Sequence, residues 1–494
     1  MGFSKTSLSL FLFFILLSSS YATSRFTRQQ RFPTRKFSSN GLAEQLIRSL
    51  NLFPKHSANI HGEYSIDDFV PGKIVEKSFS FLASSNGTSV EDLGHHAGFY
   101  TLPHSQNATM FYFFFESRNG AKDAPVVLWL TGGPGCASEL ALFYENGPFK
   151  INNDLSLSWN DFGWDKGSNI IFVDQPIGTG FSYAPDSSYI PDDEYSVTED
   201  MYDFLGAFFR EHPELVKNEF YIAGESYAGQ YIPPLASRVQ KGNKDINLKG
   251  FAIGNGMTKP ETQYPAYTQF AVDNKLITKE DQANINNKLV PPCLEAIDTC
   301  GVDGQEACET ALKQCQKIFT SILDIAGNIN YYDIRKKCEG KLCYDFSNLE
   351  KFLNNTAVRK ALGVGNIEFV SCSSEVHDAL VQDLMFNYDQ YIPPLLENGI
   401  KVLIYAGEFD FIYNWLGNSQ WVHAMKWSGK EQFVASKTVP FLVDGKNAGS
   451  LNNYGLLSFL KVNGAGHMVA MDQPKAALQM LVNWMQGNLN GTKI

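Results

Sequence analysis

The sequence predicts an α/β protein with a mixed, mostly parallel β-sheet and helices on both faces. From Phe79 onward, short apolar segments alternate with segments of helical periodicity. Several apolar segments are continuous rather than alternating, as expected for strands that are covered on both faces. The length of 494 residues is enough to bury a large core, and a content of 44% hydrophobic and 13% aromatic residues indicates a globular chain.

The strands and helices can be placed by pattern along the chain. The expected strands are Met110–Glu116, Val126–Thr131, Ile170–Asp174, Phe220–Ala223, Phe251–Gly254, Val402–Ala406 and Leu457–Val462. Helical segments lie between them, for example Val197–Arg210 and Pro474–Met485. This alternation predicts a mostly parallel sheet, in two parts of the chain, 78–255 and 379–494. The helical interval 256–378 separates them, and we interpret it as an insertion that caps a pocket.

The first 77 residues differ in character from the rest. Lys5 and the apolar stretch Leu8–Leu17, followed by small residues up to Ala22, predict a signal peptide over 1–22. The alternative of a membrane anchor is disfavoured, because no stretch reaches the roughly 20 apolar residues that a spanning helix needs. The basic segment 23–77 is interpreted as a propeptide, with a simple N-terminal extension as the alternative. We expect a protein of the secretory pathway, in the vacuole or outside the cell.

The chain has eight cysteines, and a secreted chain should pair most of them. Cys293 and Cys300 are seven residues apart, Cys308 and Cys315 repeat this spacing, and a turn separates the two pairs. Two antiparallel helices joined there would give nested disulfides. The predicted pairs are Cys293–Cys315, Cys300–Cys308, a local Cys338–Cys343 and, between the two that are left, Cys136–Cys372. A zinc site is disfavoured because Cys-x2-4-Cys pairs are lacking, and no cofactor is expected.

The segment Phe220–Gly229 carries the most informative motif. A strand-like run breaks at Gly224, and Ser226 follows it between small residues. A sharp turn from strand into helix can hold one serine hydroxyl at the crest of a sheet, provided that the neighbouring residues are small. This is the nucleophile-elbow pattern, with Ala228 where the second glycine is usual, followed by Gly229. The alternative is a glycine-rich turn that carries an ordinary serine.

A serine nucleophile needs a general base and an acid that orients this base. His467 lies in a glycine-rich loop after a predicted strand, and Asp410 follows another predicted strand. The chain order Ser226, Asp410, His467 is that of the α/β-hydrolase fold, and each residue lies just past the carboxyl end of its strand. His95 and His96 are the main competitors for the base, but they lie in no comparable loop.

An oxyanion formed at this serine needs two backbone N–H donors. One is expected from Tyr227, which follows the nucleophile, and the other from the glycine loop 131–135, most directly from Gly133. The alternative of a phosphate cradle is disfavoured, because the loop lacks a Gly-Lys-Ser/Thr ending and a Gly-x-Gly-x-x-Gly spacing. A net charge of −11 also argues against nucleic acid or an anionic membrane as a partner.

Several motifs in register resemble the serine carboxypeptidases, peptidase family S10, and most closely the plant members of type III. They are Trp129–Cys136, Gly224–Gly229, the segment around Asp410, and Gly464–Met468. The resemblance runs from about Gly94 to the C-terminus. It implies an α/β-hydrolase fold, an acyl-enzyme on Ser226, and the disulfide pairing given above. Peptide or protein C-termini would be the substrates.

The resemblance also implies how the substrate's C-terminal carboxylate is bound. The positions are Trp129, Gly132, Glu145, Glu225 and Thr131, which departs from the family's asparagine but can still donate one hydrogen bond. Two carboxyl groups can hold an incoming carboxylate only when protons are shared among them, and crowded buried acids have raised pKa values. We therefore expect activity at acid pH that fails as the two glutamates ionise. In the alternative, Glu225 is only an elbow residue and Glu145 is solvated.

The pocket for the leaving residue is also implied by the resemblance. Its residues would be Leu140, Tyr144, Tyr344 and Met468, whose apolar character favours bulky hydrophobic C-terminal residues. Where some relatives carry a free cysteine near the acid, this chain has Tyr413, so thiol reagents should not inactivate it. N-glycosylation is expected at the sequons of Asn86, Asn107, Asn354 and Asn490.

Two alternatives to a carboxypeptidase use the same scaffold. An acyltransferase that takes acyl groups from sugar esters would need the same triad, although the glutamate pair favours a peptidase. A non-enzymatic role as a stabilising partner of other proteins is disfavoured by the complete triad. The sequence leaves open whether the chain forms a homodimer.

Overall fold

The computed structural model describes residues 70–78, 95–103, 108–120, 123–242, 245–300, 305–339 and 342–489. The expected signal peptide, nearly all of the expected propeptide and the sequons of Asn86, Asn107 and Asn490 lie outside the described residues. Among the described residues, no helix has the length and apolar character needed to cross a membrane.

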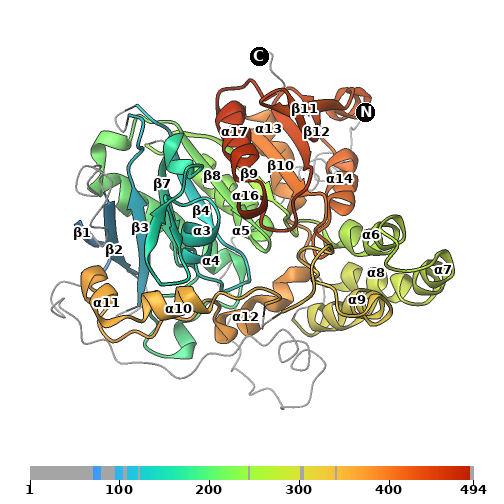
Figure 1. Cartoon of the computed structure of the whole chain (residues 1–494), viewed down its shortest axis with the longest axis horizontal. Helices are drawn as coiled ribbons and strands as arrows, with labels where there is room; N and C mark the ends of the chain where they lie inside the picture. Colours follow the sequence, from blue (N-terminus) through green and yellow to red (C-terminus); the bar gives the residue numbers. More distant parts are fainter. Residues whose placement is uncertain are drawn as a thin grey trace, which may run out of the picture. The chain divides into compact units, whose positions relative to one another are not determined.

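An eleven-stranded sheet forms the centre of the described chain, in the spatial order β1-β2-β3-β7-β4-β8-β9-β10-β13-β12-β11 (Figure 1). Its strands are β1 (Ile74–Ser78), β2 (His95–Thr101), β3 (Thr109–Phe115), β4 (Val126–Leu130), β7 (Asn169–Val173), β8 (Phe220–Glu225), β9 (Leu248–Gly254), β10 (Lys401–Gly407), β11 (Val439–Val443), β12 (Lys446–Tyr454) and β13 (Leu457–Val462). Strands β5 (Phe149–Ile151) and β6 (Leu157–Trp159) form a separate hairpin.

The strands from β7 to β13 in this spatial order are parallel to their neighbours. Antiparallel strands extend the sheet at both edges, β3, β2 and β1 on one side and β12 and β11 on the other. The predicted mixed, mostly parallel sheet is therefore confirmed. Because parallel neighbours end at the same edge, the segments after β4, β8, β9, β10 and β13 come together there.

Helices cover both faces of the sheet. They are α3 (Glu139–Tyr144), α4 (Glu194–Glu211), α5 (Ala228–Lys241), α6 (Pro260–Asp273), α7 (Lys279–Lys288), α8 (Val290–Thr299), α9 (Gln305–Ala326), α10 (Ser347–Leu353), α11 (Thr356–Leu362), α12 (Ser374–Leu380), α13 (Ile392–Glu397), α14 (Trp415–Ala424), α15 (Lys430–Ala435), α16 (Val469–Asp472) and α17 (Pro474–Met485). In β4, Leu128 faces the cluster that contains residues of α4, α5 and α14, and Val127 faces the cluster with α3 and α17. This double burial explains the continuous apolar run of β4.

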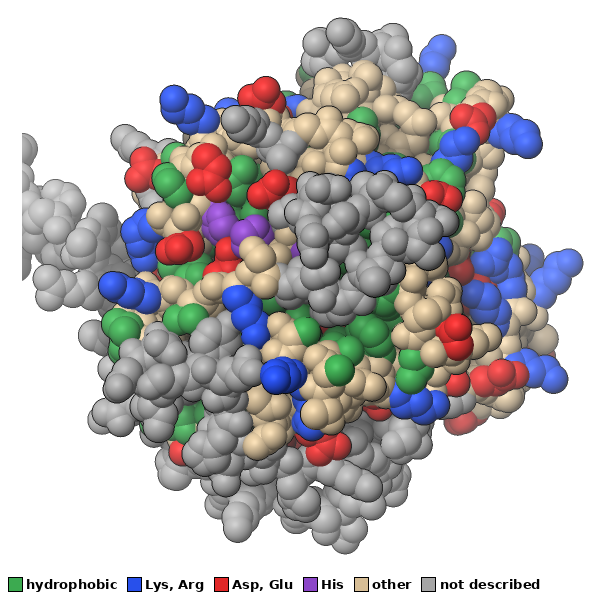
Figure 2. Space-filling view, turned by 60° about the vertical axis from the view of Figure 1, so that its left-hand side comes forward, with side chains coloured by type: hydrophobic (Ala, Val, Ile, Leu, Met, Phe, Trp, Pro, Cys, Tyr) green, Lys and Arg blue, Asp and Glu red, His purple; other side chains and the backbone are tan. Residues whose placement is uncertain are grey.

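Strand β1 changes the expected boundary between the N-terminal extension and the core. The sequence analysis began the core at residue 78, but Ile74–Ser78 pairs with β2 in the sheet. Glu76 of this strand contacts His96 Nδ1 at 2.7 Å and His212 Nε2 at 3.1 Å. Figure 2 brings this side of the molecule forward and shows histidine side chains among acidic and hydrophobic ones. The core sheet thus begins at or before Ile74.

The insertion between β9 and β10 is helical, as expected. Helices α6, α8 and α9 pack around a hydrophobic cluster of their own, and Figure 1 shows them beside the sheet rather than against its faces. The disulfides Cys293–Cys315 and Cys300–Cys308 join α8 to α9, and Cys338–Cys343 closes a short loop. Cys300 lies one residue past α8 and caps its C-terminal end. Helix α12 continues two residues past the expected boundary at 378.

Candidate active site

The turn after β8 has the geometry of a nucleophile elbow. Ser226 has a φ of +65°, a conformation that residues other than glycine rarely adopt, and its side chain is only partly buried. Its amide donates to Gly254 O at 3.0 Å, and its carbonyl accepts from Met257 N at 3.1 Å. A side chain at Gly224 would overlap the carbonyl oxygen of Leu130. Neighbouring backbone thus surrounds the serine closely and fixes its position at the crest of the sheet.

Asp410 and His467 lie in direct contact. His467 Nδ1 is 3.0 Å from Asp410 Oδ2, and both side chains are almost completely buried. Burial raises the pKa of the Asp410 carboxyl above its usual range, although the adjacent His467 lowers it. Asp410 also accepts the amides of Ile412 at 3.1 Å and Tyr413 at 3.3 Å. This environment holds one carboxylate oxygen toward the imidazole.

Asn255 was not singled out by the sequence analysis, although it belongs to the same constellation. It follows β9, is completely buried, and has a φ of +40°. Its Nδ2 donates to Asp410 Oδ2 at 2.7 Å, while its Oδ1 accepts the amide of Gly407 at 3.0 Å. Asn255 therefore ties the acid to the end of β10. The pattern Gly-Asn-Gly directly after an apolar strand is the signal that could have revealed it.

The hydroxyl of Ser226 makes no hydrogen bond to His467 within the described part of the chain. The two residues nevertheless lie at the same edge, because β8, β9, β10 and β13 are consecutive in the sheet. Catalytic hydrogen bonds are often long in enzymes without substrate. The arrangement therefore supplies an oriented acid–base pair beside a strained, accessible serine.

The glycine loop after β4 lies against this elbow. A side chain on Gly132 would overlap the amide nitrogen of Tyr227 and lie 2.7 Å from the Cβ of Ser226. Gly133 has a φ of +118°. Among the described residues, neither the Gly133 amide nor the Tyr227 amide donates to a protein acceptor. Both donors are thus available close to the serine, as an oxyanion hole requires.

A disulfide anchors this loop to the chain that precedes α12. Cys136 and Cys372 are joined, with their Cα atoms 4.0 Å apart. The amide of Ala137 donates to Ser371 O at 2.9 Å, and that of Ser373 donates to Gly135 O at 2.8 Å. The loop that carries Gly133 is therefore fixed on two sides, by the elbow and by the disulfide.

Glu145 and Glu225 form a buried carboxyl pair beside the nucleophile. Glu145 ends α3 and is 2% exposed, and Glu225 is 4% exposed. The two carboxyl groups lie within hydrogen-bonding reach of each other. Burial raises the pKa of Glu145 to about 8, and burial together with the neighbouring carboxyl raises the pKa of Glu225 well above its usual range. The structure thus argues against a solvated Glu145, and at acid pH the pair retains protons.

Trp129 lies in β4 and Thr131 in the loop after it, on either side of Leu130, which pairs with Gly224 of β8. Trp129 is buried, and its Nε1 donates to Thr131 Oγ1 at 3.0 Å. Because the threonine oxygen accepts this bond, its own hydrogen can donate to another group. The departure from asparagine at this position therefore leaves one donor in place.

The residues expected for the leaving-residue pocket are connected by aromatic contacts. Tyr144 and Tyr344 both contact Phe346. The ring centroid of Phe346 lies 5.0 Å from that of Tyr144 and 5.8 Å from that of Tyr344. Tyr332 lies 6.0 Å from Tyr344 and 4.9 Å from His467. Phe346 and Tyr332 come from the insertion and were not predicted, because no local pattern shows which insertion residues reach the sheet edge. The remaining expected residues, Leu140 and Met468, are each 7% exposed.

Other sequence-based expectations can be placed as well. The ring centroids of Tyr413 and His467 are 5.9 Å apart. No free cysteine occurs among the described residues. The side-chain amide of Asn354 donates to Phe369 O and its oxygen accepts from Phe369 N, both at 2.9 Å, so this sequon residue is partly engaged. His95 and His96 lie in β2, and no group of metal-ligating side chains occurs in the described ranges.

Comparisons with known proteins identify the family. A family model described as serine carboxypeptidase, peptidase family S10, matches residues 86–487. The chain belongs to this family and thus to the serine-type carboxypeptidases. It is 60% identical over 461 residues to serine carboxypeptidase-like 48 of Arabidopsis thaliana, covering 91% of this chain and 89% of the relative. It is 58% identical over 458 residues to serine carboxypeptidase 3 of Hordeum vulgare, covering 90% and 89%.

A solved structure supports the same fold. KEX1(delta)p, described as a prohormone-processing carboxypeptidase from Saccharomyces cerevisiae, is similar with a TM-score of 0.70 and 26% identity, over 83% of this chain and 90% of that one. The predicted α/β-hydrolase fold is thereby confirmed. The plant relatives and the paired cysteines are consistent with a protein of the secretory pathway.

Proposed function

We propose that this protein releases C-terminal residues from peptides at acid pH through an acyl-enzyme on Ser226, with a preference for bulky hydrophobic leaving residues. The observation that carries the proposal is the buried Glu145–Glu225 pair directly beside the elbow. A pair that holds protons can donate to a substrate carboxylate, whereas an ionised pair repels it. Such a pair distinguishes a carboxypeptidase from an esterase with the same triad.

In the proposed acylation step, Ser226 Oγ attacks the carbonyl carbon of the last peptide bond while His467 Nε2 accepts the hydroxyl proton. Asp410 stabilises the resulting imidazolium, and the Gly133 and Tyr227 amides donate to the oxyanion. The C–N bond then breaks, and His467 returns the proton to the leaving amine. The free amino acid departs from the pocket near Tyr344, and an ester on Ser226 remains.

Deacylation repeats these roles with water. His467 accepts a proton from the water molecule as its oxygen attacks the ester carbonyl. The C–Oγ bond breaks, the proton passes to Ser226 Oγ, and the shortened peptide leaves with a new C-terminal carboxylate. Because burial raises the pKa of Glu145 to about 8, the pair keeps its protons at acid pH, and binding of the C-terminal carboxylate and peptidase activity fall as the pH rises toward 8.

The test is release of Phe from an N-blocked dipeptide between pH 4 and pH 8, with the mature protein and with Ser226→Ala. We expect acid-favoured release that is lost in the variant. Labelling of Ser226 by a fluorophosphonate, read by peptide mass spectrometry, checks that the protein is active. A labelled protein that releases no amino acid contradicts the proposal, and acyl-sugar donors then test the acyltransferase alternative.

A further inference from the structure

The loop that carries His467 is enclosed between the sheet and the helical insertion. The His467 amide donates to the carbonyl oxygen of Tyr332 at 2.7 Å. A side chain on Gly466 would lie 2.5 Å from that oxygen and 2.8 Å from the Cβ of Asp333. On the opposite side, a side chain on Gly407 of β10 would overlap the Gly466 carbonyl. The loop therefore has no room to move unless the insertion segment moves as well.

The insertion segment that closes this space contains a buried carboxylate, Asp333. Its side chain is fully buried, and Arg335 binds both carboxylate oxygens, with Nε at 2.8 Å and Nη2 at 2.7 Å. Lys336 Nζ adds a contact at 3.1 Å. Burial alone would raise the pKa of this carboxyl, but the hydrogen bonds from Arg335 and Lys336 hold the pKa of Asp333 below its usual value. Asp333 thus holds the side chains of Arg335 and Lys336 within the segment 331–336.

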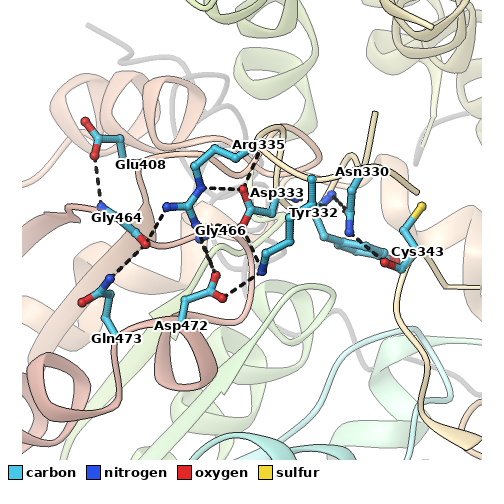
Figure 3. Close-up of polar contacts among 11 residues, drawn as sticks. Asn330, Tyr332, Asp333, Arg335, Cys343, Glu408, Gly464, Gly466, Asp472 and Gln473 are labelled. Carbon is cyan, nitrogen blue, oxygen red and sulfur yellow. Dashed lines mark hydrogen bonds and ion pairs between the residues drawn. The ribbon is translucent and has the colours of Figure 1, made fainter. Parts of the chain in front are cut away.

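The two cations then reach the histidine loop, and Figure 3 shows the contacts of Arg335 with Asp333 and Gly464. Arg335 Nη1 donates to the carbonyl oxygen of Gly464 at 3.0 Å. Lys336 Nζ lies 3.2 Å from Asp472 Oδ1, and the other oxygen of Asp472 accepts the amide of Gly466 at 2.7 Å. These contacts therefore hold the loop by its backbone on both sides of Ala465, two residues before the histidine.

The same segment also holds the loop of the catalytic acid. The carbonyl oxygen of Tyr331 accepts the amides of Phe411 at 3.1 Å and Ile412 at 3.0 Å. The Ile334 amide donates to Phe409 O at 3.1 Å. Backbone hydrogen bonds from one insertion segment thus flank Asp410 on both sides and also reach His467.

From this geometry we propose that Asp333 is a positioning residue for catalysis, and that residues 331–336 form a clamp that sets the contact between Asp410 and His467. The inference rests on the triad of the proposed function. Asp333 touches no reacting atom; it acts by keeping the two loops in register, and misplacement by about 1 Å is enough to slow an enzyme about 100-fold. The insertion then contributes to the chemical step as well as to the pocket.

The variants that test the clamp are Asp333→Asn, Arg335→Met and Asp472→Asn. Each removes one charge and keeps the size of the side chain close to the original; the charge of Asp333 is the one that both Arg335 and Lys336 contact. The matched control is Glu199→Gln, because Glu199 forms a similar two-contact pair with Arg238, at 2.6 and 3.0 Å, near the far end of α5 from Ser226. Any general effect of losing an arginine–carboxylate pair should appear in this control.

The measurements are kcat, KM and the number of sites labelled by a fluorophosphonate, so that turnover is expressed per intact site. We expect kcat per labelled site to fall about 10- to 100-fold in Asp333→Asn, with KM within about twofold of wild type. The Glu199→Gln control should keep wild-type turnover per site. The double variant Asp333→Asn/Asp472→Asn should lose less than the product of the single effects, because both act on one loop.

Two results would overturn the clamp. One is fewer labelled sites with unchanged turnover per site, which would make Asp333 a residue of stability only. The other is a loss in Asp333→Asn no larger than in Glu199→Gln. A wild-type protein that is not labelled at Ser226 would instead contradict the proposed function, so the two failures are distinguishable.

Discussion

Replacing Glu225 by methionine tests the proposed carboxylate-binding pair most sharply. The change keeps the length of the side chain but removes its O–H donor, whereas glutamine would keep an N–H donor in its place. Because Glu145 and Glu225 are 2% and 4% exposed, the bond that they make to a substrate carboxylate forms out of water. A hydrogen bond to a charged group contributes about 1.5–3 kcal/mol, so kcat/KM at pH 5 should fall by roughly 10- to 150-fold.

The assay compares an N-blocked dipeptide acid with its C-terminal amide, which lacks the carboxylate. In the wild type, the preference for the acid over the amide should be large at pH 5 and should fall as the pH approaches about 8, where Glu145 loses its proton. In Glu225→Met this preference should be small at pH 5, while hydrolysis of the amide stays near the wild-type rate.

The matched control is Glu139→Met. Glu139 forms a second buried carboxyl pair, with Asp174, and burial raises the pKa of Glu139 well above its usual range. This variant removes a buried acid without touching the pair beside the nucleophile, so its preference for the acid over the amide should match the wild type. Equal losses for acid and amide substrates in Glu225→Met would refute the reasoning, because the residue would then act on the chemistry rather than on carboxylate binding.

Three further predictions follow from single contacts. Asn255→Ala removes the 2.7 Å hydrogen bond to Asp410, so kcat should fall at least 10-fold while KM stays nearly constant. Steady-state kinetics measure both constants, and an unaltered kcat would contradict this prediction. Glu76→Gln should lower the free energy of unfolding by about 1.5–3 kcal/mol at pH 6. The pKa of Glu76 is lowered to about 2, so the stabilisation by its carboxylate is fully present above the unfolded pKa near 4.5 and disappears as the pH falls through 2. Denaturant unfolding should therefore show a smaller difference in free energy between wild type and Glu76→Gln at pH 2.5 than at pH 6. An equal difference at both pH values would refute this role of Glu76. Replacing the Cys136–Cys372 pair by serines should lower kcat more than KM, since it frees the oxyanion loop; a variant that loses thermal stability alone would show that the disulfide does not position the loop.

The central strands could be predicted because the apolar pattern that specifies them lies within each strand's own residues. Strand β4 is buried on both faces, so its apolar run is continuous, and the expected bounds of α17 match those observed. The edge strands were missed for the opposite reason. Strand β1 has an intermediate burial along most of its length, and the polar β12 gains its conformation from pairing between β11 and β13 rather than from its own residues.

The candidate site shows the same division. Ser226, Asp410 and His467 could be predicted from the sequence, because each follows an apolar strand in a loop of small or acidic residues. Asn255 and Asp333 could not be predicted in this way, because their roles depend on contacts with residues more than a hundred positions away in the chain. Such convergence is set by the order of strands in the sheet and by the path of the insertion, which no local pattern specifies.

If peptide hydrolysis passes through an ester on Ser226, as we propose, this ester can be trapped. The mature protein is mixed with an N-blocked dipeptide ending in Phe, quenched in acid within milliseconds, and digested for mass spectrometry. We expect a burst of free Phe and an acyl mass on the peptide that contains Ser226, both absent from Ser226→Ala. A burst with the acyl group on another residue, or hydrolysis that persists in Ser226→Ala, would contradict it.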